Sequence, residues 1–149
     1  TTEELIKIGA NLGADVPFFL VNKPAFCEGI GDIITPIDFP KMDFTIVSPY
    51  IFVETKKIFQ NIKNILTNDE IFGKKLSPAK GVWEDIVESQ KAFYNKLERV
   101  ALLTCSELND FKRLLGESFY MTGSGASFYG DIEVKGENSK YRVFRVSIL

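Results

Sequence analysis

The 149-residue chain contains no histidine. It therefore cannot supply the imidazole of a Ser-His-Asp or Cys-His nucleophile system, of a histidine-ligated zinc or iron site, or of a histidine pH switch. If the chain takes part in catalysis, a carboxylate or a lysine must carry the proton.

Cysteine is also scarce, with only Cys27 and Cys105. They can form at most one disulfide and neither lies in a CxxC pair, so we expect two small buried thiols in a reducing compartment. No segment approaches the roughly 18 consecutive apolar residues that a membrane span needs, and no basic-then-apolar leader opens the sequence. We therefore expect a cytoplasmic location and no membrane partner.

The sequence has no excess of basic residues. Its 18 Lys and Arg residues and 20 Asp and Glu residues give a net charge of −2. This balance disfavours nucleic acid as a partner, because phosphate neutralisation needs a basic surface. The length and the hydrophobic content of 45% are sufficient for one domain with a core. Most of the thirteen phenylalanines are expected in that core.

Apolar spacing predicts helices and short strands without regular alternation. Thr1 and Glu4 form a capping-box pattern for a helix that ends at Gly13. The apolar run 16–21, which contains Pro17, is predicted to be a short buried or edge strand. Further strands are expected at 25–28, 33–37, 44–47, 119–122, 127–134 and 141–148, helices at 54–66, 83–103 and 108–115, and a loop at 68–81. This order predicts an α+β fold, with a mostly antiparallel sheet covered by helices on one face.

Asp15 is a candidate catalytic carboxylate. It follows a predicted helix and precedes an apolar Val-Pro-Phe-Phe segment that is expected to exclude water. Desolvation raises the pKa of a carboxylate and makes it a better proton acceptor. Aspartate is also common in turns after a helix-ending glycine, and spacing alone favours that structural role.

A glycine turn formed by Gly123, Ser124, Gly125 and Ala126 separates two strand-like segments. Such a turn allows backbone N–H groups to approach an anion closely, and a serine hydroxyl adds a donor. The same residues also suit a hairpin turn. The turn matches neither the Walker A pattern nor the GxGxxG pattern.

Thr55 and Phe59 are a third candidate pair. Thr55 is expected at the start of a helix, with Phe59 one turn later on the same side. A phenylalanine beside a cleft can stack on a nucleobase. The alternative is that Phe59 is one more aromatic residue of the core.

Taken together, these segments resemble the C-terminal half of the GHMP kinases, in particular the branch of the non-mevalonate route to isoprenoid precursors. The resemblance extends from about residue 4 to about residue 129. Asp32 and Lys96 stand where glutamate and aspartate are usual, and residues 68–81 have no counterpart. The segments that carry it are, in order, LGADVPFF (12–19), AFCEGIGD (25–32), TPI (35–37), ETKKIF (54–59), NKLE (95–98) and MTGSGAS (121–127).

The resemblance implies a ferredoxin-like C-terminal domain in a kinase that uses ATP and Mg²⁺. The expected reaction is phosphorylation of the 2-hydroxyl of 4-diphosphocytidyl-2-C-methyl-D-erythritol. Asp15 would accept or orient the hydroxyl proton, Thr55 and Phe59 would line the cytidine site with the ring stacked on cytosine, and residues 123–126 would pack beside the nucleotide-phosphate loop. No metal ligand is expected in this chain.

The resemblance also implies a missing part. In these kinases an N-terminal domain carries a catalytic lysine and the glycine- and serine-rich loop that holds the ATP phosphates, and neither is found here. We therefore expect residues 1–21 to form a seam segment that joins the N-terminal domain, residues 22–149 to form the C-terminal domain, and the chain alone to be inactive.

Two alternatives stay open at this stage. One is another GHMP kinase with a different small alcohol as substrate. The other is a non-catalytic, ferredoxin-like module whose exposed aromatic residues bind single-stranded RNA. The acidic balance and the lack of a strand rich in basic and aromatic residues disfavour the RNA-binding module.

Overall fold

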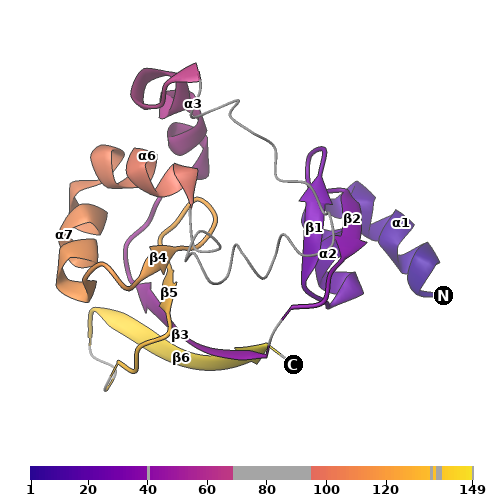
Figure 1. The fold of residues 1–149 in the computed structure, drawn as a ribbon. Helices are drawn as coiled ribbons and strands as arrows, with labels where there is room; N and C mark the ends of the chain where they lie inside the picture. The colour runs from indigo at the N-terminus through magenta and orange to yellow at the C-terminus, as the bar shows by residue number, and fades with distance from the viewer. Residues whose placement is uncertain (40, 69–94, 135, 137–138, 149) are drawn as a thin grey trace. The chain divides into compact units, whose positions relative to one another are not determined.

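The computed structural model describes residues 1–39, 41–68, 95–134, 136 and 139–148 (Figure 1). These residues fall into two compact units that divide near residue 40, and each unit is described by itself. The first unit includes residues 22–39, and the domain boundary at residue 21 stays a prediction. The predicted loop at 68–81, except for residue 68, and the first part of the helix predicted at 83–103 lie outside the described residues.

The first unit begins with helix α1 (Thr2–Leu12). The predicted capping box is present, because the Glu4 N–H donates to Thr1 Oγ1 at 3.3 Å and the Glu4 side chain reaches back to the Thr1 backbone. Gly9 lets this helix approach the next one closely. A Cβ added there would lie only 2.9 Å from a methyl carbon of Val16.

Residues Val16–Val21 form helix α2, so the prediction of a strand is wrong. Pro17 lies in the first turn, where its missing N–H group costs no helical hydrogen bond. Asn22 ends the helix in the left-handed conformation with φ of 50°. Packing against α1 decides the conformation of an apolar run that is too short to show helical periodicity.

The first unit ends with a two-stranded antiparallel hairpin, as predicted for these segments. It consists of β1 (Ala25–Glu28) and β2 (Ile33–Pro36). Cys27 on β1 is exposed, and Cys105 in the second unit is half-buried. The prediction of two buried thiols is therefore wrong, because an isolated hairpin leaves most of its side chains in contact with solvent.

The second unit has a four-stranded antiparallel sheet in the order β4-β5-β3-β6. Since β3 and β4 both pair antiparallel with β5, they run parallel to each other with β5 between them. This is the split βαβ arrangement of ferredoxin-like folds. Its elements are β3 (Met42–Pro49), α3 (Thr55–Ile65), α6 (Lys96–Thr104), α7 (Ser106–Leu115), β4 (Tyr120–Met121), β5 (Phe128–Gly130) and β6 (Tyr141–Ile148).

The three helices cover one face of this sheet, which confirms the predicted α+β architecture (Figure 1). Val47 of β3 and Phe128 of β5 are fully buried in one hydrophobic cluster with residues from all three helices. On the opposite face, Tyr129 is partly buried. This burial, together with the negative charge of Glu98 and the neighbouring Tyr120, raises the pKa of the Tyr129 hydroxyl above its ordinary value of 10.0.

The phenylalanines are less buried than the sequence predicts. Among the described phenylalanines, three are buried and four are clearly exposed, because two small units have limited cores. The buried ones are Phe111, Phe119 and Phe128, and the exposed ones are Phe19, Phe52, Phe59 and Phe144.

Candidate functional site

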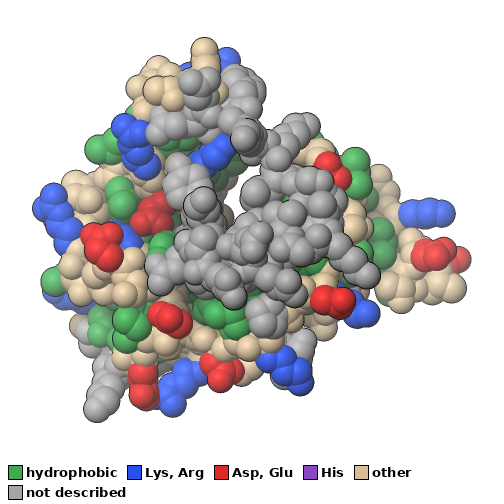
Figure 2. All heavy atoms as spheres, viewed as in Figure 1, with side chains coloured by type: hydrophobic (Ala, Val, Ile, Leu, Met, Phe, Trp, Pro, Cys, Tyr) green, Lys and Arg blue, Asp and Glu red, His purple; other side chains and the backbone are tan. Residues whose placement is uncertain are grey.

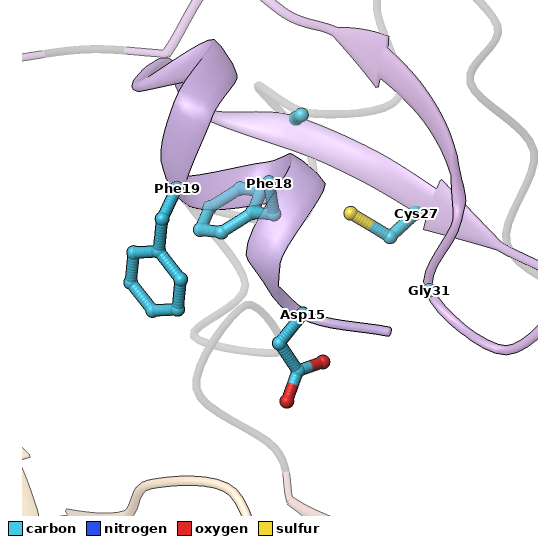
Figure 3. Close-up of a pocket in the computed structure, with 6 residues that line it drawn as sticks. Asp15, Phe18, Phe19, Cys27 and Gly31 are labelled. Atoms are coloured by element: carbon cyan, nitrogen blue, oxygen red, sulfur yellow. The ribbon is translucent and has the colours of Figure 1, made fainter. Parts of the chain in front are cut away.

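The first unit has a pocket of about 320 Å³ with Asp15 at its rim. Asp15 immediately precedes α2, and its side chain makes no capping hydrogen bond with that helix. In Figure 3 the carboxylate projects from the start of α2, while the Cys27 sulfur points from β1 toward the Phe18 ring. The Phe18 and Phe19 rings contact each other edge to face, with centroids 5.5 Å apart. The pocket is therefore largely apolar with a single carboxylate.

The hairpin turn approaches Asp15 through Gly31, which has φ of 105°. A Cβ at Gly31 would be strained and would lie 3.6 Å from Asp15 Oδ1. The EGIG segment therefore brings bare backbone up to the carboxylate. The Asp15 side chain is exposed within this unit, so the apolar residues that follow it do not exclude water as the motif suggested.

The second unit brings two of the predicted site segments together. Thr55, the first residue of α3, and Ser124, in the glycine turn, are 69 positions apart in the sequence. Their hydroxyl oxygens lie 2.8 Å apart and share a hydrogen bond. Asp15 belongs to the other unit, which is described separately.

Phe59 lies one helical turn after Thr55 and is 56% exposed. Its neighbour Ile58, in contrast, is 1% exposed and faces the core. The interpretation of Phe59 as a core residue is therefore wrong. An exposed ring on the Thr55 side of α3 is available for stacking on a flat ligand.

The glycine turn uses some of its own backbone donors. The Gly125 N–H donates to the Thr122 carbonyl, and the Thr122 N–H donates to the Ser127 carbonyl, both at 2.9 Å. Ser127 Oγ in turn donates to Ser48 Oγ of β3 at 3.0 Å. Of the amides of the turn itself, that of Gly125 is therefore unavailable to an anion, as is the amide of Thr122 immediately before the turn.

Helix α6 holds the same turn through Asn95 and Glu98. The Asn95 side chain donates to the carbonyls of Met121 and Gly123, and Glu98 Oε2 accepts a hydrogen bond from the Met121 N–H at 2.8 Å. Our sequence analysis assigned no role to these residues. An Asn followed three positions later by Glu is a capping-box signal, but Glu98 bonds to strand β4 instead of its own helix.

Surface charge, possible metal ligands and helix apolarity are the remaining features of the described residues that bear on what this chain can bind. Figure 2 shows Lys and Arg side chains interspersed with Asp and Glu on the visible face. Among the residues that the structure describes, no group of three or more His, Cys, Asp or Glu side chains could hold a metal ion. None of the described helices combines the length and apolarity required to cross a bilayer.

Comparison with known proteins gives a consistent set of relatives. No protein-family model matches the chain. The chain is 37% identical over 138 residues to the 4-diphosphocytidyl-2-C-methyl-D-erythritol kinase of Syntrophus aciditrophicus, covering 89% of this chain and 48% of that kinase. It is 33% identical over 147 residues to the kinase of the same name from Neisseria meningitidis serogroup C, covering 97% and 48%.

A solved structure is similar as well. The crystal structure of a 4-(cytidine 5'-diphospho)-2C-methyl-D-erythritol kinase superposes with a TM-score of 0.66 at 29% sequence identity. The match covers 87% of this chain and 48% of that one. The chain thus spans about half the length of the relatives it matches.

Proposed function

Because the chain is homologous to the 4-diphosphocytidyl-2-C-methyl-D-erythritol kinases and matches about half of their length, we propose that it supplies the acceptor-binding portion of an ATP-dependent kinase. The observation that carries this proposal is the extent of the similarity. A match over 97% of the chain necessarily includes Asp15, Thr55, Phe59 and the glycine turn.

The proposed reaction transfers the γ-phosphoryl group of ATP to the 2-hydroxyl of 4-diphosphocytidyl-2-C-methyl-D-erythritol. The acceptor oxygen forms a bond to the γ-phosphorus, and the bond from that phosphorus to the β–γ bridging oxygen breaks, releasing ADP. The hydroxyl proton passes to the Asp15 carboxylate and then to solvent. Such a reaction depends on positioning and charge neutralisation more than on covalent help from the protein. Mg²⁺, when bound, would neutralise charge on the phosphates.

Several roles follow for the other residues. Phe59 stacks on the cytosine ring, Thr55 contacts the cytidyl end of the acceptor, and residues 123–126 brace the nucleotide-phosphate loop. We further propose that this loop and a catalytic lysine belong to a domain outside the 149 residues, since the matched kinases are about twice as long. The kinase would act in the cytoplasm, where ATP is available, in isoprenoid precursor synthesis.

The test is a coupled ADP-release assay with the cytidyl acceptor. The full-length gene product should turn over ATP only when the acceptor is present, and the 149-residue chain alone should not. Turnover with a different small alcohol, but not with the cytidyl acceptor, would favour another GHMP kinase. Robust turnover by the 149-residue chain would contradict the proposed need for a further domain.

Replacing Phe59 by alanine should raise the KM for the acceptor by about 5- to 150-fold, because stacking of a base on an aromatic ring contributes about 1–3 kcal/mol. The KM for ATP should stay unchanged. Steady-state kinetics of the full-length protein check this prediction. Phe144→Ala is a matched control, since that ring is 46% exposed on the opposite face of the sheet. An acceptor KM that does not change would argue against the cytidyl assignment.

A further inference from the structure

We propose that Asn95 is a positioning residue that holds the glycine turn so that Ser124 reaches Thr55 at the acceptor-binding end of α3. This inference rests on the proposed function of Thr55 and Phe59. It concerns a residue whose side-chain hydrogen bonds go to the backbone of Met121, Gly123 and Leu97, and it gives the NKLE segment a role that local sequence does not reveal.

The hydrogen-bonding capacity of the Asn95 amide matches its surroundings. Its oxygen accepts from the Leu97 N–H at 3.0 Å, which caps the start of α6. Its Nδ2 group has two hydrogens, and it donates to the Met121 carbonyl at 2.7 Å and to the Gly123 carbonyl at 2.8 Å. One side chain therefore joins a helix start to the residues on either side of Thr122.

The turn that Asn95 holds contacts the proposed acceptor site through Ser124. Gly123, whose carbonyl Asn95 fixes, is the residue before Ser124. The Ser124 hydroxyl is the hydrogen-bond partner of the Thr55 hydroxyl. A turn that loses its contacts with Asn95 no longer fixes Ser124, and Thr55 then loses the partner that orients its hydroxyl.

Holding the turn requires an asparagine at position 95, whereas capping the helix alone can be done by other residues as well. Aspartate caps a helix as well as asparagine does, so Asn95→Asp preserves the hydrogen bond to the Leu97 N–H. An ionised aspartate has no N–H group, however, and its second oxygen would face two carbonyl oxygens. The substitution therefore separates positioning of the turn from stability of the helix.

The first measurement is amide hydrogen exchange in the full-length gene product. In Asn95→Asp, the Thr122 and Gly125 amides should exchange at least 10-fold faster than in the wild type, while the Leu97 amide keeps its protection. Equal exchange of Thr122 and Gly125 in both proteins would overturn the proposal. Because exchange requires no turnover, it decides whether Asn95 holds the turn even if the kinase assay of the wild type fails.

The second measurement is steady-state kinetics with the cytidyl acceptor. Asn95→Asp and Ser124→Ala should each raise the acceptor KM by about 2- to 10-fold, the range for loss of one neutral hydrogen bond. The double variant should be no worse than Asn95→Asp alone, because both changes break the same chain of contacts. Multiplying effects, or an acceptor KM unchanged in Asn95→Asp, would overturn the proposal.

The controls separate charge and folding from positioning. Asn64→Asp adds the same charge at an exposed position near the far end of α3 and should leave the acceptor KM unchanged. If Asn95→Asp does not fold, Asn95→Ser replaces it, since serine also caps a helix but is too short to reach both carbonyls. A wild type without activity toward the cytidyl acceptor would refute the proposed function, and with it the acceptor role of Asn95.

Discussion

Asp15→Asn in the full-length gene product should lower kcat by about 10²- to 10⁴-fold, the usual effect of removing a general base. Asparagine has nearly the same shape as aspartate and can still orient a hydroxyl, but it cannot accept the proton. The KM for the acceptor should change little, because the proposed contact of Asp15 is with the reacting hydroxyl and not with the cytidyl group. The coupled ADP-release assay measures both constants.

We expect the Asp15→Asn substitution to affect activity without affecting stability. The side chain is exposed and makes no capping hydrogen bond with α2, so its removal should change the free energy of unfolding by less than about 0.5 kcal/mol. Asp38→Asn is the matched control, since Asp38 is another exposed carboxylate of the first unit. A kcat within a few-fold of wild type would show that Asp15 does not act as a general base, because asparagine can still orient the hydroxyl but cannot accept its proton.

The exposure of Asp15 also bears on how the proposed general base would be desolvated. The motif analysis expected the following apolar residues to desolvate the carboxylate, but within its own unit the side chain is open to solvent. Desolvation would therefore have to come from the bound acceptor or from parts of the protein beyond this unit. Water exclusion by substrate strengthens electrostatic interactions at the moment of reaction, which agrees with a base that acts only in the complex.

Local patterns predicted the limits of several helices because local interactions determine them. The capping box at Thr1 and Glu4, the periodic apolar face of α3 and the glycine after α7 each act within a few residues. Residues 16–21 are different. Six apolar residues have no readable period, and their helix depends on packing against Gly9 of α1, which lies outside the run itself.

The candidate site was predictable in its parts but not in its connections. Thr55 and the glycine turn were both found as motifs, yet the hydrogen bond that joins Thr55 to Ser124 spans 69 positions. Asn95 and Glu98 contact strand β4 across more than 20 positions. These contacts arise only when α6 packs onto the sheet, so the sequence near Asn95 shows a helix start and nothing of the turn.

Glu98→Ala should be the most destabilising change near the candidate site. Glu98 and Lys112 are only 17% and 11% exposed, and Glu98 Oε1 lies 3.5 Å from Lys112 Nζ. The alanine leaves a nearly buried ammonium without its carboxylate and removes the acceptor of the Met121 N–H. We expect a loss of about 3 kcal/mol, and a fall in Tm of about 6–12 °C by circular dichroism.

Asp110→Ala is the control for this prediction, because it breaks an ion pair with Arg113 in which both side chains are more than 70% exposed. Such pairs contribute little, so its Tm should stay within about 2 °C of wild type.

A double variant tests whether the charge of Lys112 is the cause. In Glu98→Gln with Lys112→Met, the glutamine oxygen still accepts from the Met121 N–H and no buried charge is left unpaired. The double variant should lose less free energy of unfolding than the two single variants lose in sum, by at least about 1 kcal/mol. The double variant should still be less stable than the wild type, because Lys112→Met also removes the hydrogen bonds that Lys112 donates to the carbonyls of Gly116 and Phe119. Strictly additive losses would mean that Glu98 stabilises the sheet through Met121 alone, and that the glycine turn after β4 does not depend on the ion pair.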